Sequence, residues 1–516
     1  MSEKEYIVSL NRGVDHVAFN QEMIATTGAG AIPGRTVNVA DQRATNTRNT
    51  HYNLTDDEAE ALKNDSRVYG VDLLPDLDPD TGIGVRAEQT GLFTKTTLDR
   101  GEFLNWGMRR MNEATNPYTG VNVTGGYNYT LDGTGVDVVI VDSGIQADHP
   151  EFQDADGVSR VQEIDWFDVS GVSGTMPPEH YTDYDGHGTH VAGTLAGKTY
   201  GWAKNAKIYS IKLAGLEGPT DPNSGITVTA MADVIIAWHN AKAVDPATGY
   251  KRPTVVNHSW GYLRRYDTVT NLTYRGDLKT GTDIDTTAKR WAFGLPPTTS
   301  NGRFATNLRL ASVDADVQLM IDAGIHVCVA AGNRSHKIDV AGGDDYDNFM
   351  AANTGSVSYQ RGSSPYDDEA HIVGNIDSAE HTGGLEQKSA SSECGPGVSV
   401  YAPGTDIMSA MSTTNRFGAT LVDNPYPADA TFLINNIGGT SMASPQVAGL
   451  LALWLQLNPN ATPAQGLSFI NSTAKTVQLY DTASAVAYTD TRSLLGGENR
   501  FAFNKFNSNV QMKLGR

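Results

Sequence analysis

Three hydroxyl side chains lie within five positions of residues 438–445, whose sequence is GGTSMASP. They belong to Thr440, Ser441 and Ser444, and the apolar run 447–455 follows directly. A serine or threonine before an apolar run commonly caps a helix, because its oxygen accepts a hydrogen bond from an unpaired backbone N–H. A serine at the positive end of a helix can also be a nucleophile, provided that a base takes its proton. This segment by itself leaves both interpretations open.

A base and an acid for such a serine occur earlier in the chain. Residues 185–193, DGHGTHVAG, contain His187 at an expected turn and His190 inside an apolar run. Two histidines three residues apart suggest a metal site, but a catalytic zinc usually needs a third protein ligand. We therefore interpret His187 as a general base and His190 as a buried structural residue. The apolar run 138–141 ends at Asp142, a residue type that either caps a turn or orients a histidine.

An amide side chain and two glycines complete the candidate groups. Residues 327–333, VCVAAGN, bring Asn333 to the end of an apolar run. An asparagine there is either an ordinary turn residue or a donor to a developing oxyanion. Gly438 and Gly439 have no side chains, so a peptide backbone can approach Ser441 closely.

The elements that must position these residues follow a regular alternation. From about residue 100, strand-like apolar runs alternate with helical ones, which predicts an α/β fold with a mostly parallel sheet covered on both faces. Ligands of such sheets lie beyond the carboxyl ends of the strands, where Asp142 and Asn333 are expected. The runs that support this prediction are 136–141, 190–195, 208–213, 226–238, 254–257, 315–323 and 325–330.

The sequence outside these runs predicts a division into several parts. The sequence of residues 1–76 predicts a small α+β domain. Its expected elements are strands at 5–10 and 68–74, a helix near 14–24, and a loop over 26–50. Thr55 and Glu58 form a capping-box pattern for a second helix. The remaining parts are a Pro-, Gly- and Asp-punctuated linker at 77–99, a large domain at 100–475, surface insertions near 262–310, 334–368 and 411–431, and an extension at 476–516.

Composition argues against several classes of function. The chain has 39 Lys and Arg against 59 Asp and Glu, a net charge of −20, which disfavours nucleic-acid and anionic-membrane partners. No run approaches the roughly 18 apolar residues of a membrane span. The first eight residues lack the pattern of a secretory signal, so we expect a protein that stays in the cell, is carried in an assembly such as a virus particle, or lacks its leader. Cys328 and Cys394 are expected to be buried thiols.

Taken together, the motifs resemble those of the subtilisin-like serine proteases, or subtilases. Asp142-Ser143-Gly144, the HGTH of 187–190 and the GTSMASP of 439–445 resemble the family's three active-site motifs, in the same chain order. Ala331-Gly332-Asn333 resembles its oxyanion-hole motif. The resemblance covers about residues 100–475. Residues 1–76 resemble the family's inhibitory prodomain, and 198–206 is similar to the proteinase K branch.

The resemblance implies a serine endopeptidase that is made as an autoinhibited precursor, with a processing site expected within 77–99. Ser441 would be the nucleophile, His187 the base, Asp142 its orienting acid, and Asn333 an oxyanion donor. The same resemblance implies a set of substrate-binding residues, which flank an extended peptide or line the specificity pocket. They are Ser224, Gly225, Ser259, Trp260, Gly261, Ala330, Ala331 and Gly332.

The resemblance also implies binding partners, and it leaves open two alternatives to the peptidase function. The expected partners are a polypeptide substrate and the chain's own prodomain as inhibitor. No cofactor is expected and no metal ligand is assigned, while calcium on a surface loop is left open. The small residues at 330–332 predict a roomy pocket that tolerates apolar side chains. One alternative is a dormant or structural subtilase-fold component of a larger assembly with its prodomain retained. A serine esterase is disfavoured, because Gly-x-Ser-x-Gly does not surround Ser441.

Overall fold

The computed structural model describes most of the chain. The described residues are 3–43, 46–75, 105–113, 116, 129–218, 221, 225–246, 248–300, 302–353, 355–377, 386–417, 424–476, 479–481 and 487–506, with the backbone alone for 81–85. Most of the predicted linker at 77–99 and parts of the predicted extension at 476–516 therefore lie outside the described residues.

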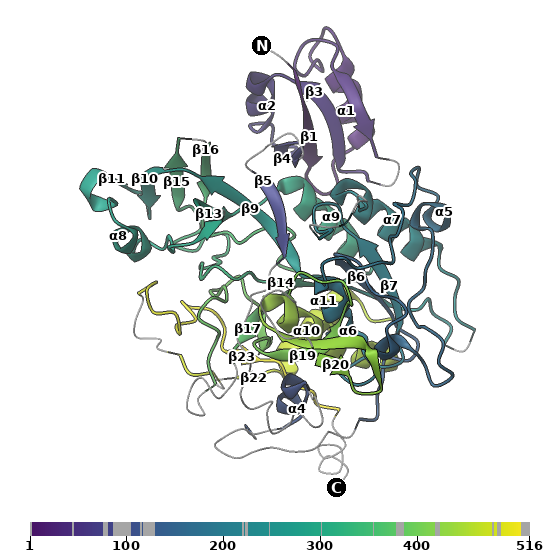
Figure 1. Cartoon of the computed structure of the whole chain (residues 1–516). Helices are drawn as coiled ribbons and strands as arrows, with labels where there is room; N and C mark the ends of the chain where they lie inside the picture. The colour runs from purple at the N-terminus through teal and green to yellow at the C-terminus, as the bar shows by residue number, and fades with distance from the viewer. Residues whose placement is uncertain are drawn as a thin grey trace.

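The largest sheet of the described part has eight strands in the order β22-β23-β18-β17-β14-β8-β6-β7 (Figure 1). Its neighbouring strands run parallel, except for β22 and β23 at one edge. The mostly parallel sheet predicted from the sequence is confirmed. The strands are β6 (Asp137–Asp142), β7 (Lys207–Lys212), β8 (Thr254–His258), β14 (His326–Ala330), β17 (His371–Ile376), β18 (Val400–Pro403), β22 (Lys475–Thr476) and β23 (Arg500–Phe501).

Helices cover both faces of this sheet. On one face, α6 (His187–Ala196) and α10 (Thr440–Leu457) pack against each other and against the central strands. On the other face, α7 (Val228–Ala241) packs on α9 (Ala311–Asp322), which contacts β14. β6 and β14 are buried at every position, which explains their continuous apolar sequences. Further helices are α4 (Trp106–Asn112), α5 (Trp166–Ser170), α8 (Thr287–Ala292) and α11 (Pro463–Thr473).

The N-terminal residues form a small α+β unit with its own core, drawn in purple above the large domain in Figure 1. Its antiparallel sheet has the strand order β2-β3-β1-β4. The capping box of Thr55 and Glu58 is present, as predicted. The prediction of a loop throughout 26–50 is wrong, because a mostly exposed strand lies there and is defined by pairing rather than by apolar alternation. The elements are β1 (Lys4–Leu10), α1 (His16–Ile24), β2 (Asn38–Gln42), β3 (Asn49–Leu54), α2 (Asp56–Leu62) and β4 (Val68–Leu73).

One strand lies inside the predicted linker. β5 (Thr81–Val85) runs antiparallel to β9 (Trp260–Tyr266), with Gly84 opposite Gly261 and Val85 opposite Trp260. Its sequence, TGIGV, has no apolar alternation long enough to predict a strand. The strand forms because a distant backbone offers it hydrogen-bond partners. Figure 1 shows β5 descending from the N-terminal unit to the large domain.

The predicted insertions contain strands, and two of the insertions share a sheet. The first and second insertions share a sheet in the order β11-β10-β15-β16, and β9 pairs with β13. The third contributes to the sheet β19-β21-β20. The strands are β10 (Val269–Tyr274), β11 (Asp277–Thr280), β12 (Thr299–Ser300), β13 (Arg303–Asn307), β15 (Phe349–Ala352), β16 (Gly355–Ser358), β19 (Ile407–Met411), β20 (Asn424–Tyr426) and β21 (Asp429–Ile437).

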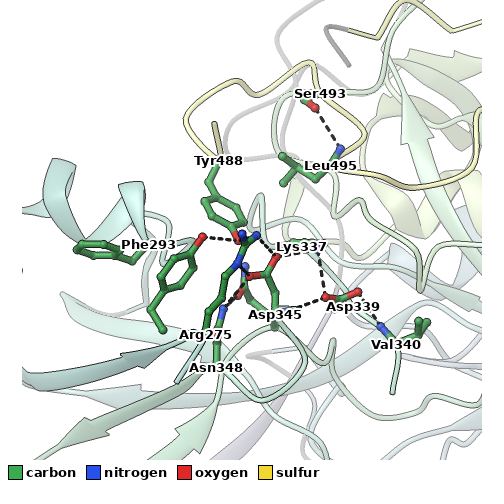
Figure 2. Close-up of polar contacts among 12 residues, drawn as sticks. Arg275, Phe293, Lys337, Asp339, Val340, Asp345, Asn348, Tyr488, Ser493 and Leu495 are labelled. Carbon is green, nitrogen blue, oxygen red and sulfur yellow. Dashed lines mark hydrogen bonds and ion pairs between the residues drawn. The ribbon is translucent and has the colours of Figure 1, made fainter. Parts of the chain in front are cut away.

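A buried carboxylate joins the insertions to the C-terminal part of the chain (Figure 2). Asp345 accepts from Arg275 Nε at 2.7 Å and from Lys337 Nζ at 2.7 Å. Arg275 Nη2 also lies 3.5 Å from the Tyr488 hydroxyl. Burial raises the pKa of Asp345, but the hydrogen bonds from these cations outweigh it and hold the pKa well below its usual range. The aspartate therefore stays ionised and ties three distant segments together.

Candidate active site

The strand β6 and the helix α6 bring Asp142 and His187 together. Asp142 is the last residue of β6, and His187 is the first residue of α6. His187 Nδ1 lies 2.7 Å from Asp142 Oδ1, and both side chains are fully buried. His187 Nε2 has no hydrogen-bond partner in the described part of the chain. A ring that donates its Nδ1–H to a carboxylate presents Nε2 as a base.

A second histidine in this helix has a structural environment. His190 Nε2 lies 2.9 Å from the Ile407 carbonyl and 3.1 Å from the Asn435 carbonyl. Burial lowers the pKa of His190 to about 3, so the ring is neutral and donates one hydrogen bond toward these oxygens. The prediction of a buried structural histidine is confirmed.

Ser441 lies in the first turn of α10, and its hydroxyl does not cap the helix. The N-cap is Gly439, without a side-chain hydrogen bond, so the interpretation of the hydroxyls as caps is wrong. Ser441 Oγ instead donates to the Ser259 carbonyl at 3.0 Å. Pro445 lies inside α10, and it has no N–H for the Ser441 carbonyl. That carbonyl accepts a hydrogen bond from Ser259 Oγ at 2.9 Å.

The other two hydroxyls of this segment have different partners. Ser444 Oγ donates to Asn257 Oδ1 at 2.7 Å, and Asn257 Nδ2 donates to Ser259 Oγ at 2.9 Å. This chain of hydrogen bonds reaches the backbone of the nucleophile candidate through Ser259. Ser444 therefore supports the position of α10 against β8, and its hydroxyl is committed to that contact.

Thr440 fixes the orientation of the Asn333 amide. The backbone N–H and the hydroxyl of Thr440 both donate to Asn333 Oδ1, at 2.9 and 3.0 Å. The hydroxyl oxygen in turn accepts from Gly332 N at 3.1 Å. Because the amide oxygen faces Thr440, the Nδ2 donors lie on the other side of the amide group. This is the orientation that donation to an oxyanion requires.

Comparison with known proteins decides the family. A family model described as the subtilase family matches residues 133–500, which is more than half of the chain. The chain belongs to the subtilase family. The site residues Asp142, His187, Asn333 and Ser441 all lie within the matched segment.

This subtilase resembles characterised proteins over most of its length. Alkaline serine exoprotease A of Vibrio alginolyticus is 26% identical over 434 residues, 84% of this chain and 56% of that protein. The extracellular serine proteinase of Thermus sp. (strain Rt41A) is 28% identical over 360 residues, 70% of this chain and 59% of that protein. The chain thus spans a little over half the length of these relatives.

A solved structure shares the fold. Fervidolysin from Fervidobacterium pennivorans, described as a keratinolytic enzyme related to subtilisin, aligns with a TM-score of 0.53 and 19% identity. The alignment covers 99% of this subtilase and 61% of fervidolysin. This likeness confirms the α/β fold class predicted from the sequence.

The predicted substrate-binding residues of the subtilase lie in several environments. Trp260 and Gly261 pair with β5, and Ser259 contacts Ser441 as described above. Ala330 and Ala331 are buried at the end of β14, and Gly332 follows them. Gly225 is buried, with its N–H donated to Glu217 Oε1 at 2.7 Å. Ser224 lies outside the described residues.

Sequence reasoning missed Asp183, which holds the start of α6 in place. Gly186, the N-cap of α6, has no side chain, and Asp183 accepts its N–H at 2.9 Å. Asp183 also accepts the Thr189 N–H at 2.9 Å and the Ser143 hydroxyl at 2.9 Å. One carboxylate therefore connects the turn after β6 with the start of α6. The available signal was an aspartate three residues before a glycine N-cap.

Two further observations concern metals and membranes. The described residues contain no group of three or more His, Cys, Asp or Glu that could hold a metal ion. Cys328 and Cys394 are buried thiols, as predicted. Among the described helices, none combines the length and the apolar character needed to cross a membrane.

Proposed function

We propose that this subtilase is a serine endopeptidase, which hydrolyses peptide bonds through an acyl-enzyme on Ser441. The observation that carries the proposal is the buried pair of Asp142 and His187, whose Nε2 has no hydrogen-bond partner among the described residues. In the proposed reaction, Nε2 takes the proton of Ser441 Oγ as that oxygen attacks the carbonyl carbon, and then gives it to the leaving amine. Asp142 stabilises the resulting imidazolium. A water molecule next attacks the acyl-enzyme by the same proton route. No step requires a cofactor.

Two N–H donors would hold the oxyanion of this reaction. The backbone N–H of Ser441 belongs to the first turn of α10, where backbone donors have no partner within the helix. The Asn333 amide is oriented by Thr440 with its Nδ2 group on the side away from that residue. Donors held in place before the reaction stabilise the developing charge without reorganisation.

The N-terminal unit is proposed to inhibit the precursor by occupying the substrate groove. The support is β5, which adds an antiparallel strand to Trp260 and Gly261, as an extended peptide substrate would. Arg43 anchors the unit to the large domain, where its guanidinium contacts Asp233 on α7 and Asp316 on α9 at 2.9–3.2 Å. An inhibitor connected to the groove by its own chain acts at a high effective concentration.

A covalent probe tests this function. The purified chain is treated with a fluorophosphonate before and after removal of the N-terminal unit, and the adduct is mapped by mass spectrometry. We expect labelling of Ser441 only after removal, and no labelling in Ser441→Ala. Labelling of another residue, or no labelling of the processed protein, would contradict the proposal and would favour the dormant structural component.

A further inference from the structure

A buried glutamate contacts the loop that carries Asn333. Glu393 is fully buried, and its backbone N–H donates to the Gly332 carbonyl at 3.0 Å. Its side chain passes Gly332 on the side where any other residue would have a Cβ atom. A Cβ at that position would lie 2.7 Å from Glu393 Cγ and 2.9 Å from Oε1. Gly332 therefore provides the space that the carboxylate occupies.

In the described part of the chain, only one oxygen of this carboxylate has hydrogen-bond donors at normal distance, while the His336 backbone N–H lies near enough to lower the pKa of the group. Oε1 accepts from Asn307 Nδ2 at 2.8 Å and from the Arg334 backbone N–H at 3.2 Å. Oε2 is buried and has no hydrogen-bond partner in the described part of the chain. Arg334 Nη1 donates to the Thr299 carbonyl at 3.4 Å, and the positive charge of Arg334 lowers the pKa of the Glu393 carboxyl group. A buried carboxylate oxygen without a donor is costly to fold, so its presence in a native site requires an explanation, and a donor supplied by a ligand is one.

The carboxylate contacts two segments that the resemblance assigns to substrate binding. Gly332 follows β14 and belongs to the expected wall of the specificity pocket. Asn307 belongs to β13, where it pairs with Leu263 of β9, the strand that carries Trp260 and Gly261. Because Glu393 contacts Gly332 and accepts from Asn307, it connects these two segments.

The register of β5 indicates which substrate residue this pocket receives. Val85 pairs with Trp260, and the residue before Trp260 is Ser259, which exchanges two hydrogen bonds with Ser441. In a peptide bound in this register, one residue lies opposite Trp260. The next residue of the peptide is then presented to Ser441. In this chain the residue after Val85 is Arg86, which lies outside the described residues.

We propose that Glu393 determines the specificity of this subtilase, and that its pocket takes a basic side chain, arginine or lysine, on the amino side of the cleaved bond. The inference rests on the proposed peptidase function. A guanidinium or ammonium group supplies both the N–H donor that Oε2 lacks and the opposite charge. This replaces the apolar-tolerant pocket expected from the small side chains at 330–332.

The chain's own first substrate is then the bond between Arg86 and Ala87. Its hydrolysis leaves a carboxylate on Arg86 and an amine on Ala87.

Peptides that differ at one position test the assignment. The processed protein is assayed with a series carrying Arg, Lys, Gln, Leu, Phe or Glu before the cleaved bond. We expect kcat/KM for Arg to exceed that for Phe by about 10–100-fold, as one charge-assisted hydrogen bond provides. Glu393→Gln should bring this ratio close to one, and Glu393→Asp should restore part of it. The N-terminus of the processed protein should be Ala87.

A second buried glutamate is the matched control. Glu151 is fully buried but accepts from the Thr199 and Tyr200 N–H groups and the Tyr426 hydroxyl, outside the pocket. Glu151→Gln should reduce stability without changing the Arg-to-Phe ratio. If Glu393→Gln does not fold, the Arg-to-Phe ratio of kcat/KM in the unmodified enzyme tests the assignment by itself. Hydrolysis with no preference for Arg or Lys, or an unchanged ratio in folded Glu393→Gln, overturns the assignment of Glu393. Failure to hydrolyse any peptide overturns the peptidase function itself.

Discussion

At the scale of single residues, the partners of each hydroxyl decide its role. Ser441 and Ser444 lie three positions apart in one helix, but Ser441 contacts a backbone carbonyl that can release it, whereas Ser444 satisfies the Asn257 amide oxygen. Ser441→Ala should lower peptide hydrolysis by on the order of 10⁶. Ser444→Ala should cost about 1–3 kcal/mol of stability, because a buried acceptor loses its donor. Steady-state kinetics and thermal melting of both variants separate the two effects. An equal loss of turnover in folded Ser444→Ala would contradict the choice of nucleophile.

The amide of Asn333 gives a second prediction for a single residue. Asn333→Ala should lower kcat by about 10²–10³, because one donor to the oxyanion is lost. The KM value should change little, since the oxyanion exists only in the transition state. Thr440→Ser, which keeps the hydroxyl that orients the amide, is the control and should retain most of the activity. A raised KM with unchanged kcat would instead indicate a role in ground-state binding.

Glu393 predicts a pH dependence of specificity. Burial raises the pKa of Glu393 to about 7. Hydrogen bonds from Asn307 and from the His336 backbone, and the charge of Arg334, act in the opposite direction. The carboxyl group is thus mostly neutral at pH 6 and mostly ionised at pH 8. His336 beside it does not titrate in this range, because burial lowers its pKa to about 3.

The Arg-to-Phe ratio of kcat/KM should therefore rise about tenfold between pH 6 and pH 8. Competition between the two peptides in one reaction measures the ratio directly, because a change in the groups that act on every substrate affects both peptides equally. In Glu393→Gln the ratio should be independent of pH. A rise of the same size in that variant would assign the titration to another group.

At the scale of elements, the docking of the N-terminal unit depends on buried rather than exposed charge. The Arg43 side chain is 3% exposed and contacts α7 and α9, whereas Arg12 is 44% exposed and pairs with Asp322 and Glu369. Removing one partner of a buried ion pair costs about 3–5 kcal/mol, and removing an exposed pair costs about 0–1 kcal/mol. The two arginines are therefore expected to differ strongly in how firmly they hold the unit.

Hydrogen exchange in the full-length Ser441→Ala background, where processing cannot occur, measures this difference. Arg43→Met should speed exchange of the β9 amides that face β5 by about 10²–10³-fold, because the unit opens more often. Arg12→Ala is the matched control and should change the same rates by less than about fivefold. Equal effects of the two substitutions would show that the buried pairs do not govern docking.

At the scale of the whole molecule, the Asp345 network in Figure 2 connects segments from two insertions and from the C-terminal part. Asp345→Asn should lower the free energy of unfolding by on the order of 3 kcal/mol, because Arg275 and Lys337 lose their shared carboxylate. Chemical denaturation measures the change. Asp347→Asn, at an 87% exposed position paired with Arg361, is the control and should change it by less than about 1 kcal/mol. Similar losses in both variants would contradict the role of the network.

The sequence by itself determined the family and the fold class of this subtilase, and it singled out the candidate site residues. Each of Asp142, His187, Asn333 and Ser441 lies in a contiguous motif, and the continuous apolar runs around them imply a parallel sheet, because its strands are buried on both faces. Both kinds of signal are local, so they can be recognised without knowing which segments meet.

Only the tertiary structure decided the features that depend on distant partners. β5 and β2 exist because other strands pair with them, and two insertions share one sheet across intervening domain core. The Glu393 carboxylate is placed by Asn307 and Gly332, which lie far from it in the sequence. Backbone pairing and burial between separated segments leave no local periodicity, and this is the physical reason that the sequence alone could not predict them.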